Sequence, residues 1–244
     1  MLLRLTPRFL TKVWGSTHLE PWFRDTLGKT GEVWFESATQ LPLLVKFLFT
    51  TEALSVQVHP EGKTEMWHVL AAEPGARVAA GFHTPISKER LRESALSGEI
   101  EDLLEWHDAR PGDTFFLPAG TVHAIGPGLT LCEIQQYSDI TYRLFDYGRP
   151  RELHLDQAIQ VSHLGPHAAL QPAREGVLVS CKYFTTEKLR IAGRLQCEPS
   201  GPGNMIAVLE GTLEIGGQPA VAGQVWFGTT PFELSGHATI LRTS

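Results

Sequence analysis

The sequence predicts an all-β protein with a few helices, folded as two small β-barrels or jelly rolls. Its 244 residues are enough for one large β domain or two small ones. The 23 glycines and 16 prolines are scattered along the chain, as expected where turns join many short strands. The segment LEGTLEIGGQPAVAGQVWFG alternates strand, glycine turn and strand. Both halves of the chain show similar turn punctuation, which favours two barrels.

Short segments in the first half are rich in aliphatic and aromatic residues and bounded by turn residues, as is typical of strands. Two helical patches interrupt them. The first begins at Thr84–Pro85, a cap followed by proline at the first helical position, and resumes over 99–106 after a break at Ser97–Gly98. The second covers 155–164. The predicted strands are 42–50, 54–60, 65–72, 76–82, 113–119, 129–136 and 141–147.

The second half follows a segment with two prolines and no clear periodicity, GPHAALQPAREG, which we interpret as a linker at 165–176. The predicted organisation is therefore an N-terminal catalytic barrel with a helical insert at 1–164, the linker, and a smaller β domain at 177–244. This smaller domain has no histidine or carboxylate in ligand spacing, so we expect it to hold no metal. Its predicted strands lie in 177–191, 204–216, 223–228 and 238–244.

Composition excludes several partners. The formal charge of −6 argues against a nucleic-acid partner, although a few local cations can still hold a small anion. The first fifteen residues lack the pattern of a signal peptide, and no stretch is apolar enough for a membrane span. Three widely spaced cysteines fit a reducing compartment. We therefore expect a cytoplasmic protein without a membrane partner, and its oligomeric state is left open.

A set of oxygen and nitrogen donors stands out in SVQVHPEGKTEMWHVL, residues 55–70. Gln57 and His59 are two positions apart, so on a strand both side chains point to one face. A short turn can bring Glu65 back to the same point. Far along the chain, G-x5-P-x-G-x2-H ends at His123. Such a set suits zinc, with iron, manganese, nickel or cobalt as alternatives, whereas a lone histidine is more often structural.

These motifs resemble those of the cupins, with glutamine in place of the first histidine and Pro127 in place of a later asparagine. More narrowly, LLVKFLFTTEALSVQVHP, GKTEMW, LPAGTVHAIGPG and EIQQYSDITYRLFDYGR resemble type I phosphomannose isomerases of the short bacterial form. The resemblance is strong over 31–155 and loose over 182–242. One departure is the short turn 60–64, where that family usually has a longer insert, and we expect this to open the site.

The resemblance implies a two-barrel cupin that interconverts mannose 6-phosphate and fructose 6-phosphate with a bound zinc ion. It implies metal ligands at Gln57, His59, Glu65 and His123. It also places the active-site arginine of the S-D-x-T-x-R motif at Arg143.

The same resemblance puts Asp139 beside that arginine and a proton-transferring carboxylate at Glu133. The chemistry agrees, because isomerisation through an enediol needs a base near two carbons and a group that stabilises negative charge on oxygen. Two alternatives stay open: Glu133 could orient His123, and Arg143 could be an ion-pair partner of an aspartate. The candidate cations for substrate phosphate are Lys46, Lys63 and Arg149.

Two other functions compete with the isomerase. One is a non-catalytic, metal-containing cupin that binds a sugar. Retention of Glu133, Asp139 and Arg143 together speaks for the enzyme. The other is an iron-dependent oxygenase, which glutamine at position 57 disfavours because only two imidazoles remain. The exact sugar phosphate is left open.

Overall fold

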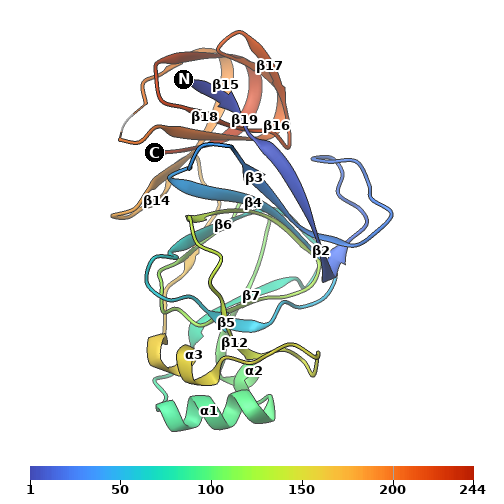
Figure 1. Cartoon of the computed structure of the whole chain (residues 1–244), viewed down its shortest axis with the longest axis vertical. Coiled ribbons are helices and arrows are strands. Elements are labelled where there is room, and N and C mark those ends of the chain that lie inside the picture. Colours follow the sequence, from blue (N-terminus) through green and yellow to red (C-terminus); the bar gives the residue numbers. More distant parts are fainter. Residues whose placement is uncertain (200) are drawn as a thin grey trace.

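Three antiparallel sheets make up the computed structural model, which describes residues 1–199 and 201–244 (Figure 1). A seven-stranded and a five-stranded sheet pack face to face and form the first barrel, lower in Figure 1. The third sheet, also of seven strands, forms the second barrel above it. The prediction of a mostly β protein with a few helices is confirmed.

The first barrel contains every strand that the sequence predicts before residue 150. The strands of its larger sheet, in spatial order, are β13 (Leu170–Gln171), β9 (Thr114–Leu117), β6 (Glu65–Ala72), β11 (Leu129–Gln136), β4 (Leu43–Thr50), β3 (Thr30–Glu36) and β2 (Thr6–Ser16). Those of the smaller sheet are β12 (Tyr142–Phe145), β5 (Val56–Val58), β10 (His123–Ile125), β7 (Arg77–Phe82) and β8 (Leu104–Asp108).

The second barrel is one continuous sheet. Two long antiparallel strands dominate it, pairing over twelve positions from Thr186↔Thr243 to Cys197↔Phe232. Its strands are β1 (Leu2–Arg4), β18 (Val225–Gly228), β16 (Asn204–Ile215), β19 (Phe232–Thr243), β15 (Thr185–Cys197) and β14 (Gly176–Ser180), with β17 (Gln218–Val221) paired to β16.

Two strand pairings cross the predicted boundaries at 164/165 and 176/177. Strand β1 leaves the N-terminal part and pairs with β18 of the second barrel. Strand β13 lies inside the predicted linker and pairs with β9 of the first barrel. In both cases a short segment covers the open edge of a sheet, because unpaired edge groups are costly to leave bare. The division into 1–164, 165–176 and 177–244 stays a prediction.

Three helices lie against the smaller sheet of the first barrel, among the residues described (Figure 1). Helix α1 (Lys88–Ser97) begins later than predicted, because the side chain of Ser87, not Thr84, accepts the hydrogen bond from the Arg90 amide. The predicted helix over 99–106 is wrong beyond Leu103, since the following residues pair with β7 as strand β8. The other helices are α2 (Ile100–Leu103) and α3 (Leu155–Val161). None of the described helices has the length and apolarity that a bilayer-spanning helix requires.

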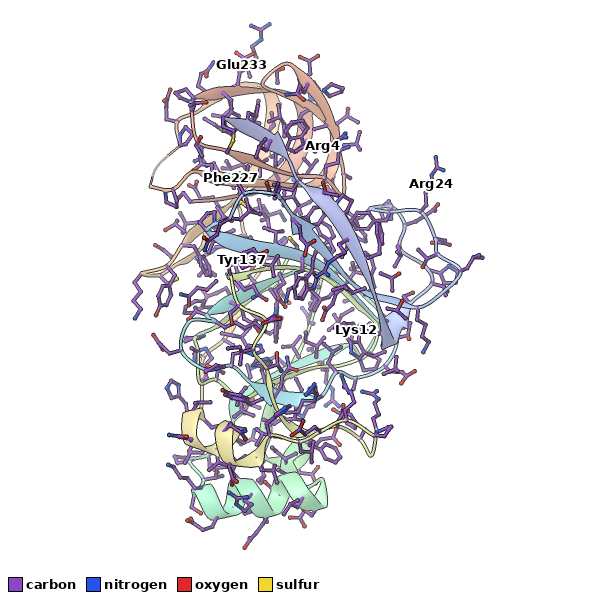
Figure 2. The ribbon with its side chains drawn as sticks, viewed as in Figure 1. Arg4, Lys12, Arg24, Tyr137, Phe227 and Glu233 are labelled. Carbon is purple, nitrogen blue, oxygen red and sulfur yellow. The ribbon has the colours of Figure 1, made fainter. Side chains whose placement is uncertain are left out.

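One hydrophobic core joins the two barrels. Phe47 and Met66 come from the larger sheet of the first barrel, and Met205 and Phe227 come from the second. Figure 2 shows Phe227 in the second barrel. Since these side chains pack in one cluster, each barrel covers apolar surface that the other would expose to water.

Replacing Phe227 by alanine should lower the free energy of unfolding by about 3–5 kcal/mol, because it opens a cavity in the shared core. Phe9→Ala is the matched control, since Phe9 is 44 % exposed. Scanning calorimetry should show a single transition in the wild type, shifted in Phe227→Ala and little moved in Phe9→Ala. Two separate wild-type transitions would contradict a shared core.

Stability should also fall with acid through His68. This side chain is buried and its Nδ1 lies 3.0 Å from Thr114 Oγ1. Burial, helped by the charge of Lys188, lowers its pKa to about 3. The unfolded chain has a histidine pKa of about 6.5, so between these values the unfolded state binds the extra proton and stability rises with pH.

The variant His68→Asn should therefore flatten the curve of unfolding free energy against pH. The loss in wild type is up to about 1.4 kcal/mol per pH unit between about pH 6.5 and pH 4.5. Urea unfolding at several pH values measures it, with the exposed His237→Asn as control. Equal slopes in both variants would exclude His68 as the source.

Candidate metal centre and substrate pocket

Three strands bring the predicted ligands together. Gln57 on β5 and His123 on β10 are direct partners in the antiparallel register, so their side chains share a face. His59 directly follows β5, and Glu65 is the first residue of β6. Gly120 shapes the turn before His123 with φ = 87°, and a Cβ there would meet the Val161 carbonyl oxygen at 2.9 Å. Only glycine fits this turn without strain.

The ligand atoms of His59, Glu65 and His123 all lie within 4.8 Å of one another, and all three residues are buried. His59 Nε2 is 3.3 Å from Glu65 Oε2, and His123 Nε2 is 3.6 Å from Glu65 Oε1. The Nδ1 atoms face backbone carbonyl oxygens of Ile140 (3.0 Å) and Thr121 (2.9 Å). A carbonyl only accepts, so each Nδ1 carries the proton and each Nε2 keeps its lone pair for a metal.

The charge state of the cluster also suits a metal. Burial lowers the pKa of His59 to about 4, so its imidazole is neutral near pH 7, the form that binds metals. Burial alone would raise the pKa of Glu65, but His59 and Lys63 bring it below its ordinary value.

The carboxylate of Glu65 is thus ionised, fully buried, and without a hydrogen bond to either oxygen. Such a group is costly unless a cation meets it. The two oxygens and the two Nε2 atoms that face them therefore fit a divalent ion.

Gln57 lies at the edge of this cluster. Its Nε2 is 3.2 Å from His123 Nε2, and its Oε1 accepts a hydrogen bond from Ser55 Oγ at 3.1 Å. The hydroxyl of Ser55 can donate or accept, so the amide can turn over and present its oxygen to the centre without losing that contact.

A cavity of about 340 Å³ opens above the cluster. Gln57 and His59 form part of its wall, while Glu65 and His123 lie beneath. The structure also brings five of the other sequence-predicted site residues to this wall: Lys46, Lys63, Glu133, Asp139 and Arg143.

Lys46 and Glu133 are register partners on β4 and β11 and form a buried ion pair of 2.8 Å. Lys46 Nζ also donates to Gln135 Oε1 and lies over the ring of Trp34. Burial opposes its charge, but Glu133 and Glu32 outweigh burial and raise the pKa of Lys46. The pair is therefore charged within the cavity wall.

The second oxygen of Glu133 accepts a hydrogen bond from Trp67 Nε1 at 3.0 Å. Its two oxygens are thus held by Lys46 and Trp67. The partner that orients His123 is the Thr121 carbonyl, so Glu133 does not have that role in the structure.

Arg143 lies opposite Gln57 in the pairing of β12 with β5, one strand away from the metal cluster. Its guanidinium makes only long contacts, of 3.5 Å, to the Glu152 carbonyl and to His154. Within residues 1–199 and 201–244 it has no carboxylate oxygen within 4 Å. The alternative that Arg143 is an ion-pair partner of Asp139 or Asp146 is therefore not seen.

Lys63 and Arg149, both predicted phosphate cations, are already engaged. Lys63 is buried, with its Nζ 3.0 Å from His59 Nε2 and 3.8 Å from Glu65 Oε2. Arg149 binds the Ala53 carbonyl and the carboxylates of Glu52 and Asp146, outside the cavity wall.

Several wall residues were missed by the sequence analysis. Lys12 pairs with Glu32 at 3.3 Å across β2 and β3, two strands that the sequence did not predict. Figure 2 shows Lys12 on the flank of the first barrel. In the sequence, the only sign of these two strands is the presence of charged residues within alternating segments before residue 40. Arg151 and His154 also line the cavity, but they lie in or beside an irregular stretch that has no periodicity to read.

Comparisons with known proteins show the family to which the chain belongs. No protein-family model matches the chain. The chain is 39 % identical over 194 residues to mannose-6-phosphate isomerase of Streptococcus mutans, an alignment that spans 70 % of this chain and 61 % of that relative. It therefore spans less than two thirds of that relative's length. It is 32 % identical over 266 residues to mannose-6-phosphate isomerase ManA of Bacillus subtilis, covering 84 % of each.

Solved structures show the same architecture. The crystal structure of mannose 6-phosphate isomerase from Bacillus subtilis superposes with a TM-score of 0.86 at 27 % identity, covering 100 % of this chain and 99 % of that one. A zinc-bound mannose 6-phosphate isomerase structure shares the fold, with a TM-score of 0.76 at 16 % identity over 99 % of this chain and 98 % of that one.

The two barrels and the buried imidazole–carboxylate cluster define a two-barrel cupin. Within that class, the chain belongs to the mannose-6-phosphate isomerase family.

Metal binding should depend on His123. We expect the wild type to bind one divalent ion per chain, and zinc at about one hundred times its dissociation constant to stabilise the fold by about 2.7 kcal/mol. His123→Ala should lose both effects, while the exposed His237→Ala should keep them. Metal analysis after dialysis and thermal unfolding with and without zinc measure this. Stoichiometric zinc in His123→Ala would place the ion elsewhere.

Proposed function

We propose that the protein is a metal-dependent aldose–ketose isomerase that interconverts mannose 6-phosphate and fructose 6-phosphate through an enediol. The observation that carries the proposal is the buried cluster of His59, Glu65 and His123 directly beneath a cavity lined by Glu133 and Arg143. Family membership favours this reaction over the alternative of a metal-containing sugar-binding protein. A sugar phosphate is the proposed substrate. The cytoplasm is the proposed location, because three free cysteines suit a reducing compartment.

Zinc is the proposed metal, held by His59, Glu65, His123 and the amide oxygen of Gln57. Two neutral imidazoles, a carboxylate and an amide oxygen are a donor set that zinc accepts. When bound, the ion would polarise the substrate oxygens on the two carbons that exchange oxidation state.

The chain's own residues would move the proton. We assign Glu133 as the base that takes the proton from C2 of mannose 6-phosphate and returns it to C1 of the enediol. Lys46 and Trp67 donate hydrogen bonds to its two oxygens, so the carboxylate is fixed in direction. Arg143 would donate hydrogen bonds to the oxygen on which negative charge develops. Asp139, on the same wall, would accept a hydrogen bond from a substrate hydroxyl.

The test is a coupled assay that follows fructose 6-phosphate formed from mannose 6-phosphate. Zinc-loaded wild type should turn over, and EDTA-treated protein should not until zinc is restored. Glu133→Gln should lose about a hundredfold or more in kcat while it still binds zinc, because a positioned base contributes that much. Glu89→Gln, an exposed change on α1, is the matched control.

Stoichiometric zinc without turnover in the wild type would contradict the isomerase and favour the sugar-binding alternative. Full activity in Glu133→Gln would leave the isomerase standing but remove Glu133 as the base.

A further inference from the structure

One part of the cavity wall brings together two arginines, one of which has no carboxylate partner among the described residues. Arg143 on β12 and Arg151, in the segment between β12 and α3, both line the cavity. Burial, and then the charge of Arg151, lower the pKa of Arg143, so the two guanidinium groups act on each other. Like charges brought together repel one another unless an anion lies between them.

The other cations of the cavity have partners within the described chain. Lys46 is paired with Glu133, and Lys12 is paired with Glu32. Lys63 is within 3.8 Å of a Glu65 oxygen at the metal cluster. Of the lysines and arginines that line the cavity in the described chain, Arg143 alone has no carboxylate oxygen within 4 Å, and Arg151 is paired through its Nε and Nη2 only.

Arg151 is held in place from behind. Its Nε and Nη2 donate to the two oxygens of Asp146, a carboxylate that is 2 % exposed. The same carboxylate also takes a hydrogen bond from Arg149. Asp146 thus fixes the guanidinium plane of Arg151 through a two-point contact, and Nη1 is left without a protein partner among the described residues.

Arg143 lies opposite Gln57 on the neighbouring strand, one strand away from the metal cluster. Arg151 lines the same cavity from the segment between β12 and α3. A sugar phosphate whose carbonyl end faces the metal cluster would extend its phosphate end along this wall. Arginine suits that end, because its planar group binds phosphate oxygens in pairs.

We propose that Arg151, positioned by Asp146 and acting beside Arg143, binds the phosphate group of the substrate and makes the enzyme select a phosphorylated sugar over the free sugar. This deepens the proposed function and rests on it. It assigns the phosphate to a residue other than Lys46, Lys63 and Arg149, the three candidate cations from the sequence.

The variants Arg151→Gln and Arg151→Lys test the proposal in the zinc-loaded enzyme. Arg151→Gln should raise KM for mannose 6-phosphate about tenfold to a hundredfold, the worth of a charged hydrogen bond, and change kcat much less. Turnover of free mannose at high concentration should be unchanged. Arg151→Lys should restore part of the affinity. An equal effect of Arg151→Gln on both sugars, or no effect on mannose 6-phosphate, would overturn the proposal.

The matched control is Arg92→Gln, which breaks a surface arginine–aspartate pair between α1 and α3, away from the cavity wall. Thermal unfolding of every variant ensures that only folded protein is compared. Calorimetric binding of inorganic phosphate separates this proposal from the proposed function. If wild type fails to isomerise but binds phosphate at least tenfold more tightly than Arg151→Gln does, the isomerase fails and the anion site stands. If both bind phosphate equally, the anion site fails.

Discussion

The carboxylate of Glu65 is the constraint on which the site depends. It is ionised and buried, and no donor within the described chain satisfies either oxygen. A protein can keep such a group only if a cation compensates for the water it has lost. Two imidazoles aim their free nitrogens at it, each fixed by a backbone carbonyl behind the ring. The surrounding strands therefore position these side chains around a cation, since no donor in the described chain hydrogen-bonds to Glu65 in its place.

The register of the larger sheet extends this organisation into the cavity. Pairing β11 between β4 and β6 sets Glu133 beside both Lys46 and Trp67, so carboxylate, ammonium and indole lie in one row. A slip of β11 by one residue would turn Glu133 to the opposite face, where Cys132 and Ile134 pack in the core between the barrels. The second barrel stabilises that opposite face, where Met66 and Cys132 pack. The second barrel therefore supports the site by holding the sheet in place on the face opposite the cavity.

The sequence predicts a site residue well when the pattern that marks it lies within a few neighbouring residues. The i, i+2 spacing of Gln57 and His59 is local, and the glycine turn before His123 is a fixed pattern, so both could be read directly. Lys46 was predicted as a candidate cation for the substrate phosphate. Its partner Glu133 is 87 residues away, and that pairing is a property of the sheet alone.

The residues that the sequence analysis missed lie in pairings between strands or in irregular chain. Lys12 and Glu32 pair across β2 and β3, and neither strand was predicted from the sequence, although Val33 and Phe35 of β3 alternate with Glu32 and Trp34. Arg149 and Arg151 are two residues apart in irregular chain, where no period decides which of them faces the cavity. Asp146 decides it, by taking two hydrogen bonds from Arg151 and one from Arg149.

The short turn between His59 and Glu65 shows how the fold can replace a loop. The sequence predicts a more open site here, because five residues cannot form a lid. The turn is nevertheless fixed at several points, with the Thr64 amide bound to Gln136 and Lys63 only 4 % exposed. From the second barrel, Tyr183 donates a 2.6 Å hydrogen bond to Glu61 at the tip of the turn. The second barrel thus helps to fix the turn, and with it the positions of the proposed metal ligands His59 and Glu65 at its two ends.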